Sequence, residues 1–151
     1  MSQRLLELLL IEDNYPDVRW LQLLLGEIQF PHMMYVVRDG EQALAFLGKT
    51  GEYASAPDPD LIMVDLDLPR ISGADVVTAI RSDERLRHIP TCVLSGSPAE
   101  HMATVLKYEL DVRCYMVKPI TREAFTDALN SYDQLKPFLN AWRGTAAGEN
   151  L

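Results

Sequence analysis

Short apolar runs alternate along the chain with longer segments in which apolar residues recur every three or four positions. The first pattern is typical of buried strands and the second of helices that bury one face. Strands are predicted over residues 6–12, 33–38, 60–65, 91–95 and 113–118. Helices are predicted over residues 16–28, 40–47, 73–80, 98–110 and 122–142.

Capping residues mark where several of these helices begin. Asp39 and Gln42 form a capping box, and Ser97 is followed by Pro98 and then by an acid at the third helical position. Residues 48–59 contain Gly, Pro and small residues and are predicted to form a loop. The last helix is predicted to be unusually long, and the tail 144–151 to be disordered.

Five strands that alternate with five helices predict a parallel sheet with helices on both faces. The chain has 151 residues, which suits one domain with an ordinary core. We find no internal repeat and no second domain. We therefore expect one α/β domain over residues 1–143 that includes an extended C-terminal helix.

Composition narrows the possible partners. The net charge of −8 argues against a nucleic-acid-binding role, which needs clustered Lys and Arg. The longest apolar stretch, LLELLLI, is broken by Glu7 and is too short to span a membrane. The N-terminus has no small-residue cleavage site, so we expect a cytoplasmic protein. Cys92 and Cys114 lie in predicted strands and are expected to be small buried side chains.

Polar residues follow four of the five predicted strands. They are Glu12 and Asp13 after the first, Asp65 at the end of the third, Ser95 at the end of the fourth, and Lys118 with Pro119 at the end of the fifth. An acid at one strand end is usually a turn or a cap. Because parallel strands bring their carboxyl ends to one edge, this combination is hard to attribute to chance.

The chemistry of this set favours a metal ion and a phosphoryl group. Two carboxylates about 4 Å apart repel by roughly 4 kcal/mol at an effective dielectric constant of 20, and Mg²⁺ relieves such repulsion. Lys118 and Ser95 suit phosphoryl oxygens. A carboxylate can itself accept a phosphoryl group.

Four motifs resemble the signature of receiver domains in two-component response regulators. They are EDN (12–14), VDLDLPRISG (64–73), VLSGS (93–97) and YMVKPIT (115–121). The resemblance spans about residues 5–135 and implies a flavodoxin-like (βα)5 fold, doubly wound, with strand order 2-1-3-4-5. The stretches GEYASAPDPDLIMVDLDLP and KYELDVRCYMVKP, with the long last helix, most resemble stand-alone receivers that serve bacterial phytochrome kinases.

The resemblance implies a role for each residue of the site. Asp65 is the phosphoacceptor and a metal ligand, Asp13 a direct Mg²⁺ ligand, and Glu12 a ligand through water. Asp67 gives the metal its backbone carbonyl. Ser95 is the switch hydroxyl, Lys118 pairs with the phosphoryl group, Pro119 follows a cis peptide bond, and Tyr115 is the switch aromatic. Pro69 and Gly73 shape the turn after Asp65, and Gly96 leaves the site open.

The implied function is transfer of a phosphoryl group from the phosphohistidine of a sensor kinase, here a phytochrome, to Asp65. The domain would catalyse only this transfer and its own dephosphorylation, and it would signal through the face of the fourth helix, fifth strand and last helix. Asp67 departs from the family pattern, where Asn or Met is common. We hypothesise that its carboxylate alters the lifetime of the phosphoryl group.

The apolar stripe of the last helix leaves two alternatives open. Leu135, Phe138, Leu139 and Trp142 either pack back on the same domain or form a homodimer seam with the fourth-helix face. Residues that could form ion pairs across such a seam are Lys107, Glu109, Asp111, Arg113, Arg122 and Glu123.

Three other functions share single features with this sequence. VDLDLP resembles the D-x-D motif of haloacid-dehalogenase-type phosphatases, but there it lies on the first strand. A degenerate receiver that binds partners without phosphorylation conflicts with the full set of acids, hydroxyl and lysine. A flavin-binding domain needs a Ser/Thr/Gly-rich loop after the first strand, where EDNYPD stands instead. The sequence does not name the kinase, the downstream target or the place in a relay.

Overall fold

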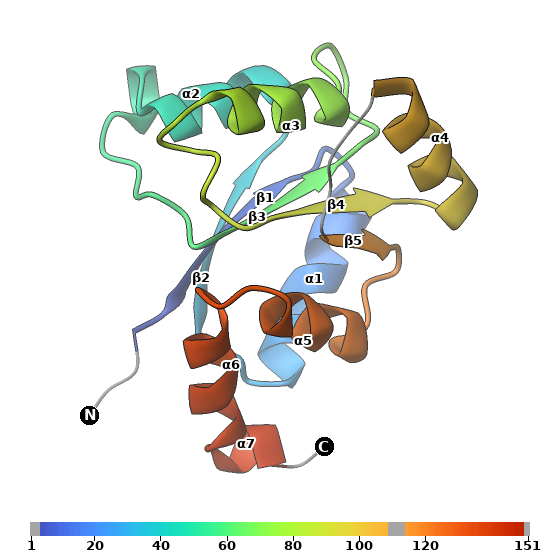
Figure 1. Ribbon diagram of the computed structural model, residues 1–151. Coiled ribbons are helices and arrows are strands. Elements are labelled where there is room, and N and C mark those ends of the chain that lie inside the picture. Colours follow the sequence, from blue (N-terminus) through green and yellow to red (C-terminus); the bar gives the residue numbers. More distant parts are fainter. Residues whose placement is uncertain (1–3, 109–113, 150–151) are drawn as a thin grey trace.

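The computed structural model describes residues 4–108 and 114–149. One parallel sheet of five strands, in the order β2-β1-β3-β4-β5, forms its centre (Figure 1). The strands are β1 (Leu6–Ile11), β2 (His32–Val37), β3 (Leu61–Asp65), β4 (Thr91–Ser95) and β5 (Cys114–Val117). All five predicted strands and the predicted strand order are confirmed, and the strand bounds agree to within one residue at every end.

Helices cover both faces of the sheet. They are α1 (Tyr15–Glu27), α2 (Gly40–Gly48), α3 (Gly73–Ser82), α4 (Pro98–Tyr108), α5 (Arg122–Asn130), α6 (Lys136–Arg143) and α7 (Ala146–Glu149), with a 3-10 turn at Gly51–Tyr53. Apolar residues of α1, α5 and α6 pack on one face, and those of α2 and α3 on the other (Figure 1). Because both faces are covered, the central strands are apolar throughout.

The single long last helix was a wrong prediction. Helix α5 ends at Asn130, and α6 begins after a turn, with Pro137 in its first turn. A continuous helix would place Pro137 in its interior, where the ring removes a hydrogen bond and clashes with the preceding turn. In the segment predicted to be disordered, Ala146–Glu149 form the short helix α7.

The stripe of α6 packs back on the domain, and this settles the two alternatives for it. Leu135, Leu139 and Trp142 are fully buried, and Phe138 nearly so. The Trp142 indole donates a hydrogen bond of 2.9 Å to the carbonyl of Ile28. These side chains are therefore not available for a homodimer seam. Of the charged residues suggested for that seam, Glu109, Asp111 and Arg113 lie outside the described residues.

None of the helices in the described ranges is long and apolar enough to cross a bilayer.

The sheet and the helices on its two faces form one αβα domain, and the carboxyl ends of the parallel strands lie at a common edge. That edge carries the predicted site.

Candidate functional site

The predicted acidic cluster forms at the carboxyl edge of the sheet. Glu12 and Asp13 follow β1, and Asp65 is the last residue of β3. One carboxylate oxygen from each lies within 4.8 Å of the other two. Glu12 and Asp65 are buried, whereas Asp13 is exposed to solvent. Three hard oxygen ligands this close fit the preferences of Mg²⁺.

Lys118 reaches into this cluster from the end of β5. Its Nζ lies 2.8 Å from Glu12 Oε2, 2.8 Å from Asp17 Oδ2 and 3.0 Å from Asp65 Oδ2. Burial of Lys118 disfavours its charge, but the bonds to the three carboxylates outweigh burial and raise its pKa above the ordinary value. The ammonium therefore stays charged and holds three acids around one point.

Glu12 is the acid of the cluster whose negative charge is disfavoured by its surroundings. Burial, followed by its interaction with Asp65, raises the pKa of Glu12 to about 8, and Lys118 opposes the rise. Near neutral pH and without a cation, Glu12 is therefore mostly protonated. A cation bound by these carboxylates would compete with that proton.

The loop after β3 is shaped around Asp65. The backbone N–H of Asp67 donates a hydrogen bond of 3.0 Å to Asp65 Oδ1. A Cβ on Gly73 would lie 2.0 Å from the carbonyl oxygen of Asp65, so only glycine lets α3 begin this close to the strand end. Gly73 thus allows α3 to begin against the backbone of Asp65 at the end of β3.

An open cleft of about 770 Å³ lies above the cluster. The residues that line it are Asp13, Asn14, Tyr15, Asp17, Asp65, Asp67, Leu68, Pro69, Gly96, Glu100 and Lys118. The side chain of Asp67 is exposed there. A Cβ on Gly96 would lie 2.9 Å from Glu100 Oε2, so glycine leaves room for the Glu100 carboxylate at the rim.

The two predicted switch residues, Ser95 and Tyr115, contact Ser97 and His101 in this structure. The Ser95 side chain is fully buried, and its hydroxyl donates to the carbonyl of Ser97 at 3.2 Å. Tyr115 is 48% exposed and stacks on His101 of α4, with 3.8 Å between ring centroids and 11° between planes. Burial of His101 lowers the pKa of its imidazole.

The turn that holds Lys118 is built as predicted. The peptide bond between Lys118 and Pro119 is cis. The backbone N–H of Lys118 donates a hydrogen bond of 2.9 Å to the carbonyl of Ser95. The end of β5 is thereby tied to the end of β4.

Asp17 and Glu100 line the cleft but do not belong to the strand-end pattern that predicts the site. The signal for Asp17 was local: Asn14 caps α1 by accepting from the Asp17 N–H at 3.1 Å. This cap places Asp17 in the first helical turn, directly beyond the end of β1. Its pairing with Lys118 joins residues 101 positions apart, and no local pattern reveals that contact.

Comparison with known proteins identifies the same family that the sequence motifs resemble. A family model described as the response regulator receiver domain matches residues 8–130. The response regulator Rcp1 of Synechocystis sp. (strain ATCC 27184 / PCC 6803 / Kazusa) is 40% identical over 111 residues, which cover 74% of this chain and 75% of Rcp1.

Two solved structures extend the likeness to the fold. The bacteriophytochrome response regulator AtBRR has a TM-score of 0.79 at 35% identity, covering 85% of this chain and 93% of AtBRR. The phosphorylated cyanobacterial phytochrome response regulator RcpA has a TM-score of 0.69 at 35% identity, covering 95% of this chain and 97% of RcpA. Both of these structures are of phytochrome response regulators.

Proposed function

Because the chain belongs to the response regulator receiver domain family, we propose that it accepts a phosphoryl group from a sensor histidine kinase on Asp65. The observation that carries this proposal is the contact of the Lys118 ammonium with Glu12 and Asp65, in a cleft open to solvent. Receivers are phosphoacceptor signalling domains and not conventional enzymes. We therefore expect only transfer to Asp65 and loss of the same group.

The proposed reaction uses one oxygen of Asp65 as the nucleophile. Its bond to phosphorus forms as the bond from phosphorus to the kinase histidine nitrogen breaks, and the imidazole keeps that electron pair. Lys118, at 3.0 Å from Oδ2, neutralises charge on the phosphoryl oxygens. The Asp67 N–H on Oδ1 holds the carboxylate in place.

The same residues would hold Mg²⁺. We propose Asp13 and Asp65 as direct ligands, Glu12 as a ligand through water, and Asp67 as a ligand through its backbone carbonyl. The oxygen donors and the 4.8 Å limit on their separation support the fit. When bound, the ion supplies positive charge to the phosphoryl oxygens.

The signal would pass through Ser95 and Tyr115. We propose that Ser95 leaves the Ser97 carbonyl for a phosphoryl oxygen and that Tyr115 then leaves its outward position on His101. Phosphorylation would thus shift the population of two arrangements of the α4–β5–α5 face. The large exposed side chains Met102, Leu106 and Tyr115 on α4 and β5 support this face as the contact surface.

The partners follow from the relatives. Two similar proteins are described as phytochrome response regulators, so we propose a phytochrome histidine kinase in the cytoplasm as the donor. Because the apolar side chains of α6 are buried in its own domain, we propose the α4–β5–α5 face as the contact surface of a homodimer. We propose no role in nucleic-acid or membrane binding.

The test is phosphorylation by acetyl phosphate with Mg²⁺, followed by intact-protein mass spectrometry. We expect one phosphoryl group on the wild type and none on Asp65→Asn. Asp67→Asn is the matched control because it removes the neighbouring carboxylate and should still be labelled. Unchanged labelling of Asp65→Asn would overturn the assignment. Steady hydrolysis of a generic phosphomonoester would favour the phosphatase alternative.

A further inference from the structure

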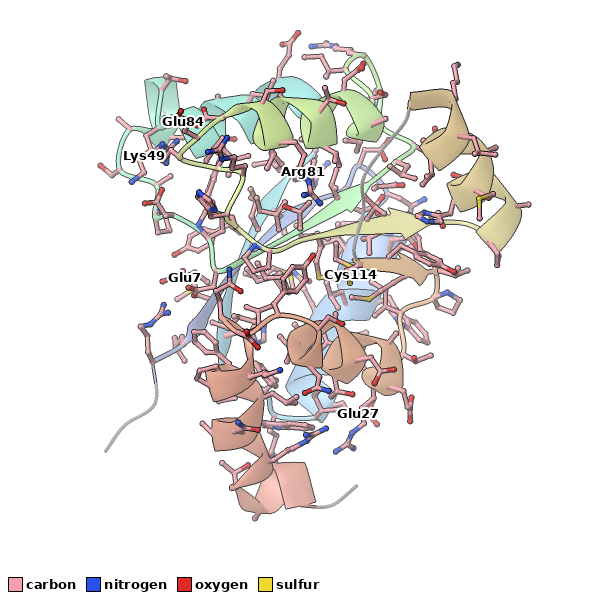
Figure 2. All side chains as sticks on the ribbon, in the orientation of Figure 1. Glu7, Glu27, Lys49, Arg81, Glu84 and Cys114 are labelled. Atoms are coloured by element: carbon pink, nitrogen blue, oxygen red, sulfur yellow. The ribbon has the colours of Figure 1, made fainter. Side chains whose placement is uncertain are left out.

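The only two cysteines of the sequence face each other across neighbouring strands. Cys92 of β4 and Cys114 of β5 are direct partners in the parallel register. Their Sγ atoms lie 2.7 Å apart. Both thiols are free and belong to the core on the face of the sheet that α1 and α5 cover. Figure 2 labels Cys114 beside β5, next to α5.

The two sulfur atoms lie closer together than van der Waals packing alone would place them. Non-bonded heavy atoms pack best at about 3.5–4.0 Å. A disulfide has a sulfur–sulfur length of about 2.05 Å and Cα atoms about 4.4–6.8 Å apart, and neighbouring strands lie about 4.7–4.9 Å apart. The strands already meet the backbone requirement, and the sulfurs need to approach by only about 0.7 Å.

We propose that Cys92 and Cys114 form an oxidation site, which a hydroperoxide converts into an intramolecular disulfide and a thiol reductant restores. This inference does not depend on phosphoryl transfer to Asp65. Cys114 directly precedes Tyr115, and Cys92 lies on the strand that ends in Ser95. Oxidation would therefore join by a covalent bond the two strands that carry the proposed switch residues.

The chemistry has two balanced steps. The Cys114 thiolate attacks one oxygen of the peroxide, the O–O bond breaks, and the departing oxygen takes a proton to leave as water or alcohol. The Cys92 sulfur then attacks the Cys114 sulfenic acid, the S–O bond breaks, and water leaves with the remaining proton. Each sulfur gives one electron, and the two peroxide oxygens accept them.

Exposure and hydrogen bonding decide which sulfur reacts first. Cys114 is 7% exposed, whereas Cys92 is fully buried. Burial raises the pKa of Cys92. Once Cys114 has lost its proton, the Cys92 thiol can donate to its sulfur, and this bond lowers the pKa of Cys114. Both effects make Cys114 the attacking thiolate and Cys92 the resolving thiol.

The test treats the folded, unphosphorylated protein with hydrogen peroxide, then denatures and alkylates it for mass spectrometry. We expect complete loss of both alkylatable thiols, a mass lower by two hydrogen atoms, and recovery of both thiols after reduction. In Cys92→Ala we expect a Cys114 sulfenic acid that a diketone reagent traps. In Cys114→Ala we expect Cys92 to stay reduced at the same dose.

Other outcomes would overturn the proposal. One is that both thiols remain alkylatable in the wild type at a dose that fully oxidises a small dithiol. Another is over-oxidation of one cysteine beside an intact second thiol, which would leave the pair as packed small side chains. A disulfide between two chains on a non-reducing gel would also refute it. The wild-type result needs no variant, so misfolding of either Ala substitution does not affect it.

Discussion

Replacing Lys118 by Met tests the electrostatic design of the site. Lys118 lies 2.8–3.0 Å from three carboxylates, and each such pair attracts by about 6 kcal/mol at an effective dielectric constant of 20. Desolvation offsets most of this, and removing one partner of a buried ion pair costs about 3–5 kcal/mol. Because Asp17 is 37% exposed, we expect the lower end, a loss of about 3 kcal/mol in unfolding free energy at pH 8.5.

The loss should depend on pH and on Mg²⁺. Glu12, with a pKa of about 8, is charged at pH 8.5 and mostly protonated at pH 6. At pH 6 the variant lacks only the pairs to Asp65 and Asp17, so the loss should fall to about 1–2 kcal/mol. Saturating Mg²⁺ should recover part of the stability at pH 8.5, because it replaces the missing positive charge.

The assay is urea denaturation followed by circular dichroism, at both pH values and with and without Mg²⁺. Lys136→Met is the matched control, because Lys136 pairs with Asp133 at 3.0 Å on the surface and should change stability by less than about 1 kcal/mol. An equal loss for Lys118→Met at both pH values, with no response to Mg²⁺, would refute this reasoning.

Three further predictions follow from the site and the core. Mg²⁺ affinity should rise as pH increases through about 8, the pKa of Glu12, because the cation displaces the proton of Glu12. Isothermal titration should show a smaller rise for Glu12→Gln than for the wild type. An equal rise in the two proteins would contradict this prediction. Asp67→Asn should change the decay rate of the phosphorylated protein by several fold, measured after removal of the donor, and equal rates would remove the tuning role. Trp142→Ala should lower the free energy of unfolding by about 3–5 kcal/mol, whereas Trp20→Ala, at a position 49% exposed, should cost far less; similar small losses in denaturant titrations would show that α6 is not part of the core.

Local patterns in the sequence predicted most of the fold. The apolar runs of β3 and β4 are buried on both faces and stand out against their polar neighbours. The predicted caps at Asp39 and Ser97 accept hydrogen bonds from the backbone N–H groups of Gln42 and Glu100. The break between α5 and α6 could also have been predicted, because Pro137 is disfavoured in a helix interior. The apolar stripe on both sides of the break instead suggested one continuous helix.

The site was predictable in its residues but not in its contacts. The strand-end rule brought Glu12, Asp65 and Lys118 together, since parallel strands share one edge. The hydroxyl direction of Ser95 and the stack of Tyr115 on His101 depend on packing between distant elements. The pairing of the two cysteines likewise depends on the register of β4 against β5, which strand patterns alone do not give.

Because α6 packs back on the core, the region that matches the family and the region that folds together end at different residues. The family match ends at residue 130, yet Phe30 in the core packs against Trp142, with 5.5 Å between ring centroids. A protein cut at the end of the matched region would retain every residue of the cleft and lose the buried side chain of Trp142 that packs against Phe30. The unit that must fold is therefore longer than the unit that carries the chemistry, and its limit is set by buried aromatic surface.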